Sequence, residues 1–285
     1  MNPILSELIE HLSLERLEDN LFRGPSRDIG TNRVYGGQVL GQAIKAAQYT
    51  VAGRAVHSLN AYFLREGDHN NPIIYNVELT RDGKSFSSRR VTAIQHGRPI
   101  FILSCSFQRP ESGLEYQEQM PDVPDPEQLE DIQSYSSRFT GEVPDKLKWA
   151  LKLAAPFDIR PVEPITLIYP EKSNPCRHIW IRTSDKLPDE PELHHAIIAY
   201  ISDFGLLDTN LLPHGMHITN TNLQIASLDH AMWFHRDLRM DEWVLYTCEG
   251  ISASEARGLA RGRFYTREGN LVASTMQEGL IRLRE

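Results

Sequence analysis

The sequence predicts an α+β protein built from two tandem copies of one unit, each a helix followed by an antiparallel sheet. The same order of helical and strand-like segments occurs twice along the 285 residues. Short local matches link the copies, such as VHSLNAYFLR with IASLDHAMWFHR and GKSFSSRR with GISASEAR. An acidic, proline-rich stretch at residues 109–130 lies between them. Because the period exceeds the ~20–50 residues of solenoid repeats, a duplicated domain is expected.

The first copy contains helical segments and then strands. Apolar residues recur at helical spacing near the start of the chain, at Leu5, Leu8, Ile9 and Leu12. A second helix is predicted over VYGGQVLGQAIKAAQYTV, where many small residues would let other backbone approach closely. Four strand-like runs follow, separated by the turn signals HNNP, RDGK and QHGR: VHSLNAYFLRE, PIIYNVELTR, SFSSRRVTAIQ and PIFILSCSFQ.

The second copy repeats this order. After a small helix near DKLKWALKLA, a helix is predicted over ELHHAIIAYISDF. Four strands are then expected: LQIASLDHAMWFHR, EWVLYTCEGIS, ARGLARGRFYT and LVASTMQEGLIRL. We therefore predict domains at residues 1–110 and 146–285, joined by an exposed linker at residues 111–145.

Composition excludes several classes of protein. With 30 Lys and Arg against 38 Asp and Glu, the net charge of −8 disfavours nucleic acid and anionic membranes as partners. Three dispersed cysteines, Cys105, Cys176 and Cys248, form neither a disulfide framework nor a CxxC metal motif. The first residues lack the pattern of a signal peptide, and no apolar run is long enough to span a membrane. We expect a cytoplasmic protein.

Small and polar residues in the second copy point to a site between its helix and its sheet. Two strands present a face of small residues, namely Gly258, Ala260 and Gly262, and Ala273, Thr275, Gln277 and Gly279. On the first strand, Ser227 faces the same way as Leu223 and, unless a bulge intervenes, as Asp229. Asp203 continues the apolar stripe of the preceding helix. The pattern therefore predicts that Asp203, Ser227 and Gln277 meet.

Two interpretations of this group stay open at this point. Asp203 could merely end its helix, while Ser227 and Gln277 satisfy backbone groups. Alternatively, an ionised Asp accepts a proton from a water that a hydroxyl and an amide hold in place. Such general base catalysis suits hydrolysis of an activated acyl bond. The matching helix of the first copy, GGQVLGQAIKAAQ, contains no carboxylate, so the second copy is the candidate catalytic half.

Six motifs occur in a characteristic order: VYGGQVLGQA, VHSLNAYFLREGD, DGKSFSSRRV, GRPIF, QIASLDHAMWFHR and ASTMQEG. Through them the sequence resembles the acyl-CoA thioesterase II family over nearly its whole length. The resemblance implies a double hotdog fold, in which each half is an antiparallel sheet wrapped around a central helix. It implies hydrolysis of fatty acyl-CoA to free fatty acid and CoA, with no cofactor, by a water held by Asp203, Ser227 and Gln277. It also implies a homo-oligomer, either a dimer or a tetramer.

Two positions depart from the pattern of that family. Glu66 stands where Pro or another small residue is common, and Asn60 where an aromatic residue or His is common. Both lie in the first half, so they bear on substrate preference more than on the water-activating group. The acyl chain is expected in an apolar channel between the halves, and backbone N–H groups near a helix start are the natural oxyanion donors.

Further residues are candidates for contact with the substrate. His57, in the matching motif VHSLNAYF, could reach the substrate or make a structural hydrogen bond. Arg257, Arg261 and Arg263 alternate along one strand face, and Arg89 lies at the matching place in the first copy. These arginines could form a solvated sheet face, or Arg89 and Arg257 could bind the phosphates of CoA.

The sequence also bears on a metal site and on two alternative functions. The histidine pairs His214 with His217 and His230 with His235 lack the further convergent ligands of a zinc site, so no metal is expected. The first alternative function is a hotdog enoyl-CoA hydratase, which generally pairs an Asp with a His. The second is a module that binds acyl-CoA without turnover.

Overall fold

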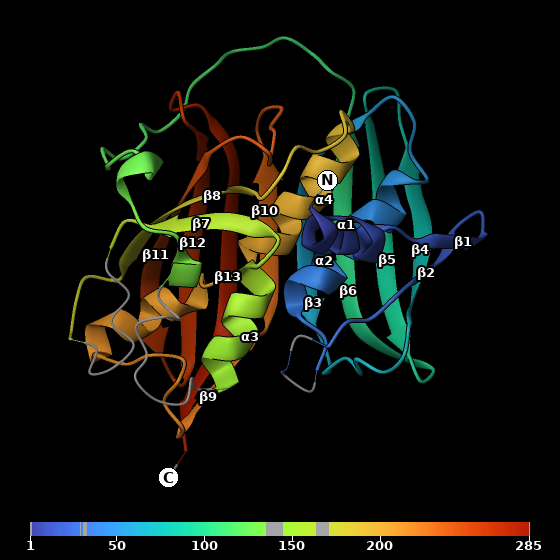
Figure 1. Ribbon diagram of the computed structural model, residues 1–285. Coiled ribbons are helices and arrows are strands. Elements are labelled where there is room, and N and C mark those ends of the chain that lie inside the picture. The colour runs from blue at the N-terminus through green and yellow to red at the C-terminus, as the bar shows by residue number, and fades with distance from the viewer. Residues whose placement is uncertain (1, 29, 31–32, 135–144, 164–170, 285) are drawn as a thin grey trace.

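The structure is a computed structural model of the chain (Figure 1). It describes residues 2–28, 30, 33–134, 145–163 and 171–284. The first half contains α1 (Pro3–Leu12), β1 (Glu15–Glu18), β2 (Leu21–Gly24), α2 (Gly36–Gln48), β3 (Ala55–Phe63), β4 (Ile73–Asp82), β5 (Phe86–Gln95) and β6 (Arg98–Gln108). A short 3-10 helix, η1 (Pro126–Gln128), follows. The second half contains α3 (Asp145–Ala154), β7 (Phe157–Pro161), β8 (Cys176–Thr183), α4 (Pro191–Ser202), η3 (Leu207–His214), β9 (Leu223–Ser227), β10 (Asp229–Phe234), β11 (Val244–Ser254), β12 (Arg257–Thr266) and β13 (Leu271–Leu283).

The predicted helices and strands are present, and four strands were missed. Strand β1 has no buried residue, so it leaves no alternating pattern in the sequence. Strands β2 and β7 span only four and five residues. In β8 the central residues are buried on both faces, which removes the alternation expected of a half-exposed strand.

The strands described form one continuous antiparallel sheet. Their order is β1-β2-β4-β5-β6-β3-β10-β13-β12-β11-β8-β7, and β9 pairs with β13 beside this path. The two halves join where β3 pairs with β10, from Ser58 opposite Trp233 to Tyr62 opposite Asp229. The duplicated units are therefore parts of one sheet.

Two central helices lie side by side, and the sheet wraps around them (Figure 1). Every residue of α2 after Gly36 is buried. Gly37 and Gly41 face α4, and a Cβ at Gly41 would lie 3.0 Å from the carbonyl oxygen of Ala196. The small residues of the motif VYGGQVLGQA thus allow the close helix packing that the sequence predicted.

The predicted strand over LQIASLDHAMWFHR is interrupted at Leu228. The N–H of Leu228 donates to Glu278 (2.9 Å), and its carbonyl accepts from the N–H of Phe63 (2.9 Å). Before the interruption Ser227 faces the helix, whereas after it His230 and the other even-numbered residues are buried. A bulge therefore interrupts the predicted strand, and Asp229 does not share the face of Ser227.

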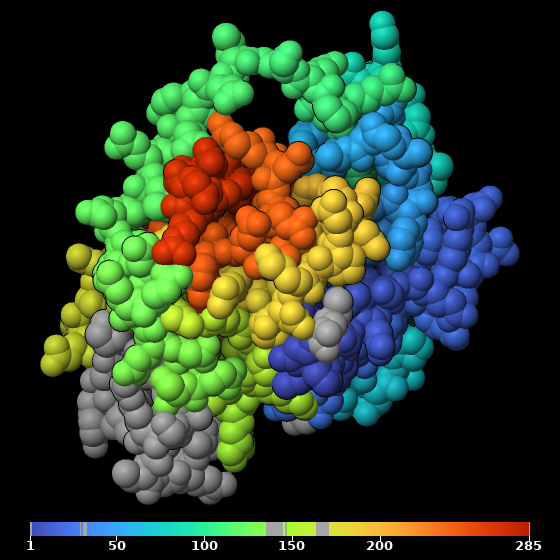
Figure 2. Space-filling model, turned by 45° about the horizontal axis from the view of Figure 1, so that its top comes forward, coloured from blue at the N-terminus to red at the C-terminus, as the bar shows by residue number. Residues whose placement is uncertain are grey.

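The segment after β6 arches over the top of the molecule and then runs along the second half (Figure 1). In Figure 2 it follows the rim of the molecule as a green band. Leu114 and Tyr116 are exposed, as expected of a linker. Further on, Met120 and Val123 pack against an apolar cluster on the outer face of the second half, formed by Trp180, Trp243, Leu245, Tyr265 and Leu271. The expectation of an exposed linker is thus wrong between Met120 and Ile132, residues 135–144 of the predicted linker lie outside the described residues, and the predicted domain boundaries stay a prediction.

Within the described ranges, none of the helices combines the length and the apolar composition needed to cross a bilayer.

A side chain at Gly37 should destabilise the fold. A Cβ there would overlap the carbonyl oxygen of Tyr200, which is backbone and cannot rotate away. We expect Gly37→Ala to lower the free energy of unfolding by roughly 1–3 kcal/mol, as measured by urea denaturation. Gly113→Ala is the control, since nothing lies within 4 Å of a Cβ at that position. Equal stability of the two variants would contradict this account of helix packing.

Candidate functional site

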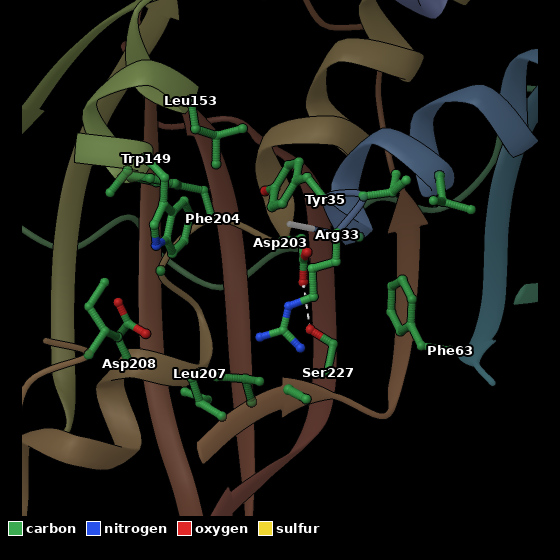
Figure 3. Close-up of a pocket in the computed structure, with 18 of the residues that line it drawn as sticks. Arg33, Tyr35, Phe63, Trp149, Leu153, Asp203, Phe204, Leu207, Asp208 and Ser227 are labelled. Atoms are coloured by element: carbon green, nitrogen blue, oxygen red, sulfur yellow. Dashed lines mark hydrogen bonds between the residues drawn. The ribbon is translucent and has the colours of Figure 1, made fainter. Parts of the chain in front are cut away.

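A cavity of about 730 Å³ lies between the halves, where the start of α2, the end of α4, β9 and α3 meet (Figure 3). Most of its wall is apolar, contributed by Val34, Phe63, Leu147, Trp149, Leu153, Phe204 and Leu207. Asp203 and Ser227 lie on the same wall, and Figure 3 shows them joined by a hydrogen bond. A cavity of this size and lining can hold a small-molecule ligand.

Three predicted side chains meet at one carboxylate oxygen. Asp203 is the C-cap of α4, and Gly205, at φ 69°, turns the chain away after it. Ser227 Oγ on β9 donates to Asp203 Oδ1 at 3.1 Å. Gln277 Nε2 on β13 donates to the same oxygen at 2.5 Å. Asp203, Ser227 and Gln277 therefore converge, although 74 residues separate the first from the last.

The start of α2, from the other half, completes the surroundings of Asp203. The backbone N–H of Gly37 donates to the carboxylate. Gly36 also lies close to the carboxylate, because a Cβ at this position would be 2.7 Å from Asp203 Oδ2. Tyr35 Oη donates to the carbonyl of Tyr200 at 3.0 Å, which fixes the beginning of α2 against the end of α4. A carboxylate is disfavoured at a helix C-terminus and favoured at an N-terminus, so α2 offsets the unfavourable effect of α4.

The environment of Asp203 makes it a stronger base than an ordinary carboxylate. Burial in the cavity wall raises its pKa to about 6, while the hydrogen bonds from Gln277, Ser227 and Gly37 act in the opposite direction. Asp208 lines the same cavity, and its negative charge raises the pKa of Asp203 further. Burial also raises the pKa of Asp208, and Arg177 nearby lowers it. At neutral pH Asp203 is ionised yet can accept a proton.

The other substrate-binding candidates lie outside this group. His57 does not line the cavity; its Nε2 is buried and has no partner among the described residues, and its ring contacts Phe86 edge-on at 5.6 Å. Arg257 is partly exposed and pairs with Glu278 (3.0 Å) and with Glu255. Its neighbours Arg261 and Arg263 pair with Glu249 and Glu118, as on a solvated sheet face.

Arg89 was expected on an exposed sheet face, and this placement is wrong. The side chain is only 2% exposed. Its guanidinium donates to both carboxylate oxygens of Asp82 and to the carbonyl and hydroxyl of Thr50. The copies differ here because Arg89 faces the helix, opposite the buried Cys105, whereas Arg257 faces outward. Arg89 therefore anchors the end of α2 to the sheet.

Several residues of the cavity were missed in the sequence. Asp208 and Trp149 carry no motif of their own. Arg33 pairs with Glu66 at 2.9 Å on the cavity wall. Glu66, which differs from the residue common in the family at this position, therefore has an ion-pair partner in the structure. At the paired glycines of VYGG the sequence predicted only close packing of backbone. Glycines at a helix start also allow close approach to an anion.

Metal-ligating side chains do not gather in the part of the chain that the structure describes. No three His, Cys, Asp or Glu side chains there are close enough to hold an ion.

Two family models match the chain, one in each half. Residues 159–280 match the family model described as "Acyl-CoA thioesterase", and residues 22–108 match "Acyl-CoA thioesterase N-terminal domain". "Acyl-CoA thioesterase 2" of Haemophilus influenzae is 38% identical over 286 residues, with 100% of each chain covered. The chain belongs to the acyl-CoA thioesterase family. The resemblance inferred from the six motifs and the enzyme class, a thioester hydrolase, are thereby confirmed.

Solved structures confirm the fold. The acyl-CoA thioesterase II TesB2 of Mycobacterium marinum is 40% identical and superposes with a TM-score of 0.80, covering 97% of this chain and 98% of that one. A protein of Alicyclobacillus acidocaldarius, described as having a hot dog fold, is 17% identical with a TM-score of 0.77, covering 98% and 99%. The double hotdog architecture predicted from sequence is therefore correct.

The charges around Asp203 make its titration predictable. Asp208→Asn removes a like charge, so the pKa of Asp203 should fall below its native value of about 6. Gln277→Leu removes a hydrogen bond to the ionised form, so that pKa should rise. The measurement is the pH dependence of the ¹³C shift of the Asp203 carboxyl group. Asp19→Asn, at an exposed position, should leave it unchanged. If the pKa of Asp203 is the same in Asp208→Asn as in the native protein, the charge of Asp208 does not raise it.

Proposed function

We propose that this thioesterase hydrolyses fatty acyl-CoA to free fatty acid and CoA, with Asp203 as the general base. One observation supports this most directly. A partly buried carboxylate, with donors from Ser227, Gln277 and Gly37, lies on the wall of an apolar cavity between the halves. The arrangement supplies a base beside a space that can hold an acyl chain.

The proposed reaction begins with a water beside Asp203 and Ser227. Asp203 takes a proton from this water as its oxygen attacks the thioester carbonyl. Ser227 lines the cavity and can hold the water, whereas Gln277 is 1% exposed and keeps the carboxylate oriented. Gln277 thus acts on the base, a smaller role than the direct contact with water expected from the sequence.

The negative charge that develops on the carbonyl oxygen needs hydrogen-bond donors. The first N–H groups of a helix have no partner within that helix. Gly36 opens α2 and lines the cavity, and no side chain caps this helix. We assign the N–H of Gly36 to the oxyanion. As the C–S bond breaks, protonated Asp203 returns its proton to the CoA thiolate, so no covalent intermediate with the enzyme is needed.

The remaining expectations are kept as part of this proposal. The apolar lining from both halves supports a fatty acyl chain as the substrate, and with it a role in lipid metabolism as part of the proposal. A homo-oligomer and a cytoplasmic location stay predictions. The hydratase and the non-catalytic binding module predict, respectively, loss of enoyl absorbance and tight binding without free thiol, and both are tested by the assay below.

Asp203→Asn should lower the rate of thiol release from acyl-CoA by at least about a hundredfold with folding retained, because the amide cannot accept the proton. Steady-state hydrolysis of a panel of acyl chain lengths is the measurement. Asp229→Asn is a matched control, because Asp229 is a partly buried carboxylate on the adjoining strand. Near-native turnover by Asp203→Asn would place the general base elsewhere.

The same proposal fixes the pH dependence of the native enzyme. Because the base must be ionised, kcat/KM should fall about tenfold per unit below the pKa of Asp203, near pH 6, and level off above it. A flat profile between pH 5 and pH 7 would oppose the assignment.

A larger side chain at Leu153 should shift the chain-length preference. Leu153 comes from α3 and forms part of the apolar wall. Leu153→Trp should reduce kcat/KM for long acyl chains, relative to short ones, by about tenfold or more, since each methylene in such a pocket is worth 10–200-fold. Leu114→Trp, at an exposed position, is the control. An unchanged ratio would mean that the acyl chain lies elsewhere.

A further inference from the structure

A second polar group lies buried behind Asp203, between α4 and the sheet. His230 on β10 is 0% exposed. Its Nε2 lies 2.9 Å from Ser202 Oγ on α4 and 2.9 Å from Thr275 Oγ1 on β13. Ser202 immediately precedes the base, and Thr275 is two residues before Gln277 on the same buried strand face. The group therefore connects the two segments that carry Asp203 and Gln277.

The hydrogen bonds determine which nitrogen of His230 carries the proton. Ser202 Oγ donates its only hydrogen to the carbonyl of Ala199 (2.9 Å), and Thr275 Oγ1 donates to the carbonyl of Ala231 (2.8 Å). Both hydroxyls must then accept from the imidazole, which requires hydrogen on Nε2. Nδ1 is buried and has no partner in the structure. Burial lowers the pKa of His230 to about 3, so the ring is neutral at physiological pH.

The same segment of α4 is held from the other side. Tyr246 Oη on β11 donates to the carbonyl of Ser202 at 2.7 Å. Side chains from two strands, β10 and β11, thus hold the end of α4 at the residue before the base, and Thr275 on β13 holds His230 in turn. A small shift there would alter the 2.5 Å contact between Asp203 and Gln277. Displacements of about 1 Å in an active site can cost a hundredfold in rate.

We propose that His230 is a positioning residue for hydrolysis, whose Nε2–H ties the end of α4 to β13 and so sets the geometry between Asp203 and Gln277. This inference rests on the proposed function of Asp203. It assigns no contact with the substrate to His230, because the ring does not line the cavity. The imidazole acts through the hydroxyls of Ser202 and Thr275.

The test compares His230→Leu, His230→Gln and the native enzyme. Leu removes the donor, so kcat should fall by about tenfold to a hundredfold while KM changes less than about threefold. The acid limb of the pH profile should move to higher pH, since a loosened bond from Gln277 stabilises ionised Asp203 less. The amide of Gln places N–H groups near the position of Nε2. His230→Gln should therefore recover most of kcat and the native profile.

A matched control separates positioning from general stability. A second buried histidine, His195, lies on α4, and its ring packs against the ring of Phe234 with 5.1 Å between the centroids. His195→Leu should lower the urea midpoint without moving the pH profile. If His230→Leu does not fold, Thr275→Val, which removes one acceptor and keeps the shape, should shift the profile in the same direction.

Each outcome decides the proposal. A folded His230→Leu with native kcat and native pH profile overturns it, as does a Gln variant no better than Leu. An unshifted profile in Thr275→Val also counts against it. Absence of hydrolysis by the native enzyme would instead reject the proposed function.

Discussion

The organisation of this protein depends on one partly buried carboxylate, held between the C-terminus of one helix and the N-terminus of another. Asp203 lies at the C-terminus of α4, where the helix dipole opposes its charge, and against the N-terminus of α2, where a dipole favours it. The close crossing of the helices, which Gly37 permits, makes this arrangement possible. Hydrogen bonds from Ser227 and Gln277 lower the cost of burial, and the remaining desolvation keeps the carboxylate basic.

The two copies have complementary tasks. The helix of the first copy contributes no carboxylate, yet its start lies beside Asp203. The second contributes the acid and its side-chain partners. Because the cavity wall draws on both halves, neither copy alone contains the site. Duplication has here allowed the copies to diverge while their contact was kept, as the contrast between buried Arg89 and outward-facing Arg257 also shows.

Sequence patterns predicted the fold class, the main helices and the meeting of Asp203, Ser227 and Gln277, because periodicity fixes which face of an element is buried. They failed where structure depends on contacts between distant segments. The interruption at Leu228 lies where the chain, which pairs with β13 both before and after it, gains β3 as a second partner, and no local pattern records this. The contribution of α2 comes from backbone groups, which are the same in every residue. The positions of Asp208 and of the apolar α3 residues on the cavity wall likewise depend on tertiary packing.

The pairing of β3 with β10 has a consequence for the chain as a whole. Cutting the molecule between its halves would leave each piece with an edge strand of unpaired N–H and C=O groups, and such strands promote aggregation. It would also strip α2 and α4 of the surfaces that they bury against each other. The duplicated protein should therefore unfold as a single cooperative unit, and its halves should become soluble only when they are made together and recombine.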